Sequence, residues 1–280
     1  MNALLAILSL LVGVSISLTV RGGASAVAVC ACTAVVTWFL INTKGPHRVF
    51  LLRLFVGGLL VRVLVGTAIH VFSAQEFFGG DALTYDYQAR LVLDFWGRVA
   101  PAGIADEMGA NGVGRGMVYL VAVIYSLTGP NMLAVQFFNA VLGAATALLI
   151  FLCAEHIFGN ARVARTAALL VAFYSSLVLW SSQALKDGPI VFLLAAAMLA
   201  TLKLGERLRP SYLLVLVASM LATLSLRFYI FYMLAAAVAG SFVMGMRAFS
   251  AGGLARQFVV VLFAGLALTY MGVLHTAGTQ

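Results

Sequence analysis

Long apolar runs alternate with short polar segments along most of this chain. The runs are continuous, without a strict alternation of apolar and polar positions, and so they predict helices, not strands. They cover residues 2–20, 24–42, 49–72, 132–154, 166–182, 188–204, 211–226, 229–246 and 257–274. Most are close to the length at which a helix crosses a bilayer. We therefore expect an all-α polytopic membrane protein with about nine transmembrane helices, forming a single transmembrane domain over residues 1–280.

The composition agrees with a membrane protein. The chain is 63% hydrophobic and 9% charged, whereas a soluble domain usually carries about 25% charged residues. The net charge of +8 comes from Lys and Arg spread over short loops, as at a cytoplasmic membrane face. We therefore expect membrane lipids as partners and no nucleic acid. Cys30, Cys32 and Cys153 all lie in apolar runs and form no disulfide or zinc pattern.

The basic residues predict a topology. Four basic clusters are expected in the cytoplasm by the positive-inside rule: Lys44/Arg48, Arg162/Arg165, Lys203/Arg207/Arg209 and Arg247/Arg256. The 37 or so residues between Arg209 and Arg247 would make one helix of roughly 55 Å, far longer than a bilayer core of about 30 Å. The chain is therefore expected to turn back near Ser225-Leu226-Arg227. This scheme predicts a multi-pass protein of the plasma (inner) membrane with a cytoplasmic N-terminus.

One stretch holds most of the acidic residues. Six of the nine lie between Ser73 and Gly114, namely Glu76, Asp81, Asp86, Asp94, Asp106 and Glu107. Acids are costly inside a bilayer, so we expect an outer acidic loop at residues 73–130, between the third and fourth spans. Within it, residues 116–129 are apolar but only about 14 residues long. This segment is expected to lie in the interface or to dip in and return.

The topology brings several charged residues to the same side of the membrane. Asp81 lies in the acidic loop, the pair Lys186-Asp187 lies in the turn at 181–189, and Arg227 lies in the turn after residue 226. All three outer turns are then expected to line one cavity at the outer leaflet, where the active face would be extracytoplasmic.

Asp81 follows Gly79 and Gly80 and opens a helical pattern that runs to about Arg98. Aspartate is a good helix N-cap, so Asp81 is expected to be a cap, a catalytic carboxylate, or both. Asp86 has Arg90 four residues later, which favours a simple ion pair. Leu91, Val92, Phe95 and Trp96 would give this helix an apolar side, so that it could lie on the membrane surface.

The other charged candidates also have structural alternatives. Asp187 could cap the next helix, and Lys186 and Asp187 could neutralise each other. Arg227 and Arg62 carry planar forks of donors that suit phosphate oxygens. Snorkelling to the surface is the alternative role, easy for Arg227 but harder for Arg62, about 13 residues into its helix.

No metal or nucleotide motif is present. The histidines show no ligand spacing. A divalent cation would need several oxygen ligands, which the outer acids could supply, but the sequence does not indicate one. We therefore predict no cofactor with certainty and leave a divalent cation open.

The acidic loop resembles a known family. Its Gly-Asp-x3-Tyr-x3-Ala segment, formed by Gly80, Asp81, Tyr85 and Ala89, looks like that of the GT-C glycosyltransferases. The protein O-mannosyltransferase and lipid A aminoarabinose transferase branch is the most similar in kind. Lys186-Asp187 is similar to that family's second outer acidic position, and the resemblance covers roughly residues 49–246.

This resemblance implies transfer of a sugar from a polyprenyl-phosphate-linked donor to an acceptor on the extracytoplasmic side. In such an enzyme Asp81 would be the base, and Lys186 and Arg227 would stabilise the leaving phosphate. Asp187 would orient Lys186 or hold the acceptor. Tyr85 and Arg62 would complete the substrate-binding set.

The chain also departs from the family. Two spans precede the one that leads into the acidic loop, and the sequence ends at Gln280 where family members usually continue. A missing C-terminal part, a minimal relative, and one subunit that needs a partner all fit these departures. Two other functions stay open: a transporter or lipid flippase, because of Arg62 and the charged outer turns, and a non-catalytic membrane scaffold.

Overall fold

The computed structural model describes residues 3–42, 45–78, 80–97 and 115–244, and over these ranges the chain is helical without any strand. The helices are α1 (Ala3–Thr19), α2 (Gly23–Asn42), α3 (Arg48–Val71), α4 (Asp81–Trp96), α6 (Gly116–Thr128), α7 (Met132–Phe158), α8 (Ala161–Phe173), α9 (Ser175–Ser181), α10 (Asp187–Glu206), α11 (Pro210–Leu226) and α12 (Phe228–Met244). A 3₁₀ turn at Gly45–His47 precedes α3. These bounds confirm the all-α expectation.

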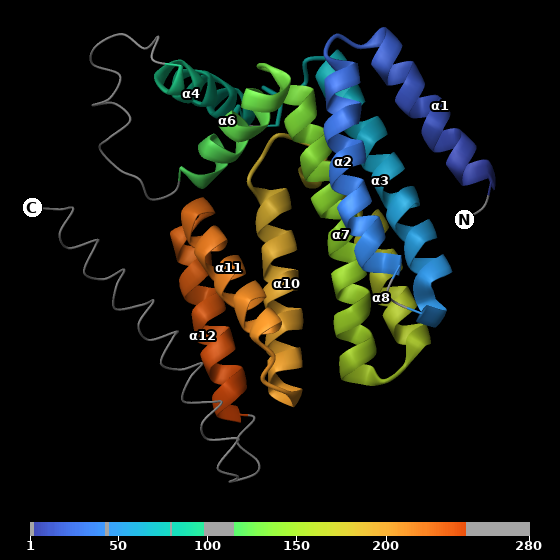
Figure 1. Ribbon diagram of the computed structural model, residues 1–280, viewed down its shortest axis with the longest axis vertical. Helices are drawn as coiled ribbons and strands as arrows, with labels where there is room; N and C mark the ends of the chain where they lie inside the picture. The colour runs from blue at the N-terminus through green and yellow to red at the C-terminus, as the bar shows by residue number, and fades with distance from the viewer. Residues whose placement is uncertain (1–2, 43–44, 79, 98–114, 245–280) are drawn as a thin grey trace, which may run out of the picture.

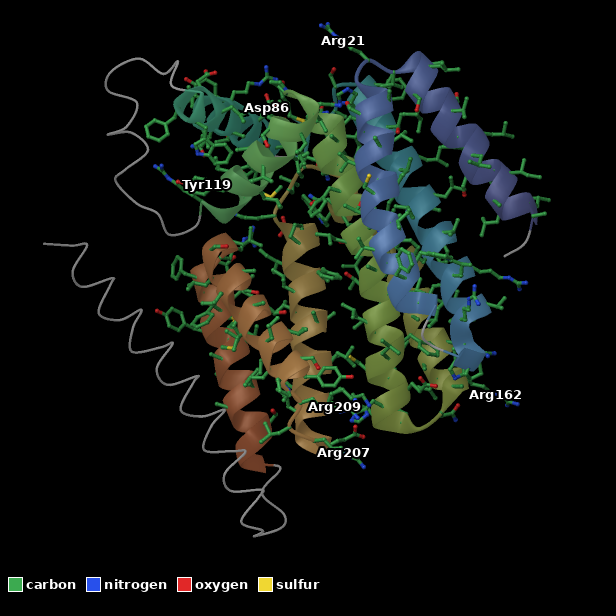
Figure 2. All side chains as sticks on the ribbon, in the orientation of Figure 1. Arg21, Asp86, Tyr119, Arg162, Arg207 and Arg209 are labelled. Carbon is green, nitrogen blue, oxygen red and sulfur yellow. The ribbon has the colours of Figure 1, made fainter. Side chains whose placement is uncertain are left out.

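Most of the helices run along one common direction, and α4 and α6 lie together at one end of the bundle (Figure 1). Arg162, Arg207 and Arg209 lie at the other end, as Figure 2 shows. We call the first the α4 end and the second the basic end. The turn between α11 and α12 falls at Arg227, which confirms the turn expected from the length of that apolar interval.

The helices support a polytopic membrane protein, but nine spans are not confirmed. Of the described helices, α3, α7 and α10 are long and apolar enough to cross a bilayer, and α8 with α9 makes a fourth candidate if the bent pair counts as one span. α1, α2, α6, α11 and α12 contain shorter apolar segments. The run expected at 257–274 lies outside the described residues.

The run expected at 166–182 is two helices instead of one. α8 and α9 meet at a bend of 54°, because Tyr174 between them is extended, with φ −63° and ψ 119°. No proline causes this break. An extended residue removes helical hydrogen bonds around it, and the carbonyl of Ala172 takes a donor from another helix, the guanidinium of Arg62.

α7 forms the centre of the bundle and packs against α2, α3, α8 and α10. Its buried positions include many small residues, among them Ala140, Gly143, Ala144 and Ala147. Small residues let helices approach closely in a membrane, where packing and hydrogen bonds hold the bundle together. α10, α11 and α12 share a separate apolar cluster that includes Leu204, Leu216 and Phe231.

Candidate functional site

Several charged residues of the predicted site line one cavity of about 470 Å³. Its lining comes from the segment around α4, from α3, α7, α8, α9 and α10, and from the turn before α12: Arg62, Phe78, Asp81, Gly143, Thr146, Val171, Leu177, Trp180, Ser181, Leu185, Asp187, Gly188, Val191 and Arg227. The structure therefore brings Asp81, Asp187, Arg227 and Arg62 together, as the topology predicted for the first three. Tyr85 and Lys186 are not among the lining residues.

Asp81 is the first helical residue of α4, and Gly80 occupies the N-cap position. The interpretation of Asp81 as N-cap is therefore wrong. Gly80 has a φ of +68°, a left-handed conformation that glycine adopts without strain. The exposed Asp81 carboxylate has no hydrogen bond or ion pair with any residue that the structure describes.

Asp187 opens α10, with Lys186 at the N-cap. Its Oδ1 atom lies 3.5 Å from Nη1 of Arg227, so the partner of Asp187 is Arg227, and not the neighbouring Lys186 as one interpretation of the sequence held. Both side chains are partly exposed. The pair leaves one carboxylate and one guanidinium side by side in the cavity wall, each with donors or acceptors to spare.

Lys186 contacts α4 instead. Its Nζ atom lies 5.8 Å from the centre of the Tyr85 ring, above the ring face, at a distance where a cation is attracted to an aromatic ring. Tyr85 is four residues after Asp81 and therefore on the same face of α4. The contact links the helix that carries Asp81 to the turn that carries Asp187.

Arg62 is almost completely buried, with 1% of its surface exposed. Its Nε donates to Ser181 Oγ at 2.8 Å, and its Nη1 donates to the carbonyls of Gly58 at 2.9 Å and Ala172 at 2.7 Å. These bonds hold the side chain inside the bundle, so it does not snorkel. Nη2 has no hydrogen bond with a described residue.

Gly143 of α7 makes room for this arrangement. A Cβ atom there would lie 2.5 Å from Ser181 Oγ and 2.7 Å from Arg62 Nε, closer than packed atoms come. Only a glycine therefore allows α7 to pass the Arg62–Ser181 pair without a shift.

The turn between α9 and α10 is held by a buried amide. Nδ2 of Asn139, on α7, donates to the carbonyls of Gln183 at 2.7 Å and Leu185 at 2.8 Å. These two bonds fix the segment that leads into Asp187. The sequence did not predict a role for Asn139, Ser181 or Gly143, because a polar or very small residue within an apolar run was their only signal.

Two neighbouring side chains bind the Asp86 carboxylate, which favours a structural role for this residue. Its carboxylate pairs with Arg90 at 3.0 Å, which confirms the predicted i,i+4 ion pair. It also accepts a hydrogen bond from the Tyr125 hydroxyl on α6. Burial, together with this bond, raises the pKa of the Tyr125 phenol, so the hydroxyl stays a donor. Asp86 thus joins α4 to α6 at the α4 end, where Figure 2 labels it.

Over the described ranges, no three His, Cys, Asp or Glu side chains are close enough to hold a metal ion together. The charged chemistry of the cavity is that of two carboxylates and two guanidinium groups.

Comparison with known families is consistent with this site. The profile of the dolichyl-phosphate-mannose-protein mannosyltransferase family matches residues 116–273, more than half of the chain. The match includes Lys186, Asp187 and Arg227 and begins after α4. No curated protein and no solved structure matches the chain. The matched range confirms the resemblance to GT-C glycosyltransferases: the chain belongs to the dolichyl-phosphate-mannose-protein mannosyltransferase family.

Proposed function

We propose that this cavity transfers a sugar from a polyprenyl-phosphate-linked donor to a hydroxyl acceptor, on the extracytoplasmic side of a plasma (inner) membrane. One observation carries the proposal: the carboxylate of Asp81, unpaired among the described residues, lines the same cavity as the Asp187–Arg227 pair. A free carboxylate beside fixed cations is the combination needed to take up a proton and to stabilise a leaving phosphate.

In the proposed reaction Asp81 accepts the proton of the acceptor hydroxyl. The acceptor oxygen forms a bond to the anomeric carbon of the sugar, the bond from that carbon to the donor phosphate breaks, and the phosphate keeps the electron pair. A positioned base typically contributes about 10²–10⁴-fold in rate. Asp187 would hold the acceptor or keep Arg227 in place.

The cationic groups would bind the donor phosphate. Arg227 is at the cavity wall and Arg62 is deeper in the bundle, with Nη2 not engaged by described residues. Lys186 would approach the phosphate from the rim, where Tyr85 holds it in contact with α4. Val171, Leu177 and Trp180 provide an apolar wall for the first isoprene units.

A transporter or lipid flippase is the second candidate, and the break between α8 and α9 favours it. Broken helices and buried charges near the middle of a membrane are typical of transporters. The two functions differ in their products, since a transporter moves the donor unchanged whereas a transferase releases free polyprenyl phosphate.

The test uses the full chain in lipid nanodiscs with polyprenyl-phosphate-linked mannose as donor and a mixture of hydroxyl acceptors. Release of polyprenyl phosphate is measured for wild type, Asp81→Asn and Asp94→Asn. Asp94 is the matched control, an exposed carboxylate on the same helix but outside the cavity lining. We expect Asp81→Asn to lower release at least 100-fold and Asp94→Asn to leave it unchanged.

Equal release by wild type and Asp81→Asn would show that Asp81 is not the base. Movement of intact donor across a proteoliposome membrane, without release by any variant, would establish the transporter instead.

A further inference from the structure

A second cavity lies along α3, and its lining shares no residue with the candidate site. Its volume is about 750 Å³, and it is walled by α1, α2 and α3 with Phe137 of α7 at its base. Apart from the hydroxyls of Ser9 and Ser17 and the indole of Trp38, its lining is apolar. We call it the α1–α3 groove.

The groove has the length of one bilayer leaflet. Its lining on α3 extends from Leu52 to Val63, a rise of roughly 17 Å, which is about half of a 30 Å hydrocarbon core. α1 diverges from α2 toward its N-terminus, as Figure 1 shows. A single hydrocarbon chain of a lipid fits such a shape.

A cation lies beside the basic end of this groove, outside its lining residues. Arg53 is exposed and makes no hydrogen bond or ion pair with any described residue. It lies three residues before Val56 and seven before Leu60, two groove residues, and hence on the same face of α3. Helical side chains lean toward the N-terminus of their helix, so its guanidinium extends toward the basic end.

The groove is separate from the catalytic cavity. Leu59, Leu60 and Val63 contribute to the groove, whereas the neighbouring Arg62 donates to Ser181 on α9 and to Ala172 on α8. The two sites also have their cations at opposite ends of the bundle, Arg227 near the α4 end and Arg53 near the basic end. One lipid phosphate cannot occupy both.

We propose that the α1–α3 groove binds one chain of an anionic phospholipid from the leaflet at the basic end, with its headgroup phosphate on Arg53. Arginine offers a planar fork of donors that matches phosphate oxygens. Basic residues beside a crevice between transmembrane helices are a recurrent way of holding anionic headgroups. The lipid would fill the space between α1 and the rest of the bundle.

Native mass spectrometry of the detergent-purified full chain tests this proposal, with phosphatidylglycerol and phosphatidylcholine of identical chains as probes. Arg53→Gln should weaken phosphatidylglycerol binding about fivefold and phosphatidylcholine binding by a smaller factor, because the choline ammonium already offsets the charge of that phosphate. Arg209→Gln is the matched control, an exposed arginine at the basic end (Figure 2) that precedes α11, a helix packed against α10 and α12. It should change neither.

A second variant tests the groove itself. A Cβ atom at Gly13 would have only Val27 Cγ1 within 4 Å, at 3.8 Å, so Gly13→Leu projects into the groove without disturbing the helices. It should weaken binding of both lipids. Equal effects of Arg53→Gln and Arg209→Gln, or unchanged lipid binding by Gly13→Leu, would overturn the proposal. So would competition by added polyprenyl phosphate, which would assign the groove to the donor, or conversion of a dimer to a monomer by Gly13→Leu, which would assign it to a second copy.

Discussion

At the scale of single residues, the bundle depends on how few polar side chains it buries and how well it satisfies them. An unsatisfied polar group in an apolar interior is costly, and a buried arginine is tolerated only with partners. Arg62 has three acceptors, on its own helix, on α8 and on α9. These three bonds take the place of hydrogen bonds to water for the Arg62 guanidinium, which lines the candidate site.

Gly143→Ala is expected to weaken this cluster. The added methyl would lie within 3 Å of both Arg62 Nε and Ser181 Oγ, and the forced shift should lower the free energy of unfolding by roughly 1–3 kcal/mol. Gly240→Ala is the matched control, because a Cβ at this helical position meets nothing within 4 Å. It should be neutral or stabilise by about 0.5–1 kcal/mol.

Thermal unfolding in detergent compares the two alanine variants with wild type. A Gly143→Ala protein as stable as Gly240→Ala would mean that α7 does not depend on the close approach to Ser181.

At the scale of elements, the turn between α9 and α10 is the part that places Asp187. Residues 182–185 of this turn are buried, and the amide of Asn139 donates to two of its backbone carbonyls. On the same helix, three residues earlier, Gln136 is fully buried and neither of its amide atoms has a partner among the described residues. Asn139 therefore contributes hydrogen bonds that hold the turn, whereas Gln136 contributes none with the described residues.

Two leucine substitutions on α7 separate these roles. Asn139→Leu leaves two buried carbonyls without a donor and should destabilise by about 1–2 kcal/mol, near the upper range of hydrogen bonds between membrane helices. Gln136→Leu removes unpaired polar atoms from an apolar position and should be neutral or stabilising by about 1 kcal/mol.

The assay is unfolding in detergent together with donor turnover. Asn139→Leu should lower turnover as well, because Asp187 loses its support, whereas Gln136→Leu should retain it. Loss of stability in Gln136→Leu equal to that in Asn139→Leu would contradict this account.

Most of the helix positions follow from hydrophobic runs, but the contacts between helices do not. The bounds of α3, α4 and α10 agree with the sequence to within a few residues, because a long apolar run with polar ends defines both ends of a helix. The break at Tyr174 carries no proline or glycine signal. At this break the Ala172 carbonyl accepts a hydrogen bond from Arg62, which is distant in the sequence, and no local pattern can show such a contact.

At the scale of the whole molecule, the basic loops and the acidic helix α4 lie at opposite ends. Arg162, Arg207 and Arg209 lie together at one end, and Asp86 lies at the other, where Arg21 is also found (Figure 2). The positive-inside rule predicted this separation, and with it the meeting of Asp81, Asp187 and Arg227 in one cavity. The same rule could not show which neighbours hold these residues: the Asp187–Arg227 pair and the Lys186–Tyr85 contact depend on packing between helices.

The orientation of the bundle in the membrane is still a prediction. We expect the α4 end to be outside, since basic loops are retained in the cytoplasm. In a background where Cys30, Cys32 and Cys153 are replaced by alanine, Asp94→Cys places a thiol on exposed α4, and Arg209→Cys places one at the basic end. A membrane-impermeant maleimide applied to intact cells should label the thiol at 94 and reach the thiol at 209 only after permeabilisation. The reverse labelling would put the candidate site on the cytoplasmic side, and the acceptor would then have to be a cytoplasmic molecule.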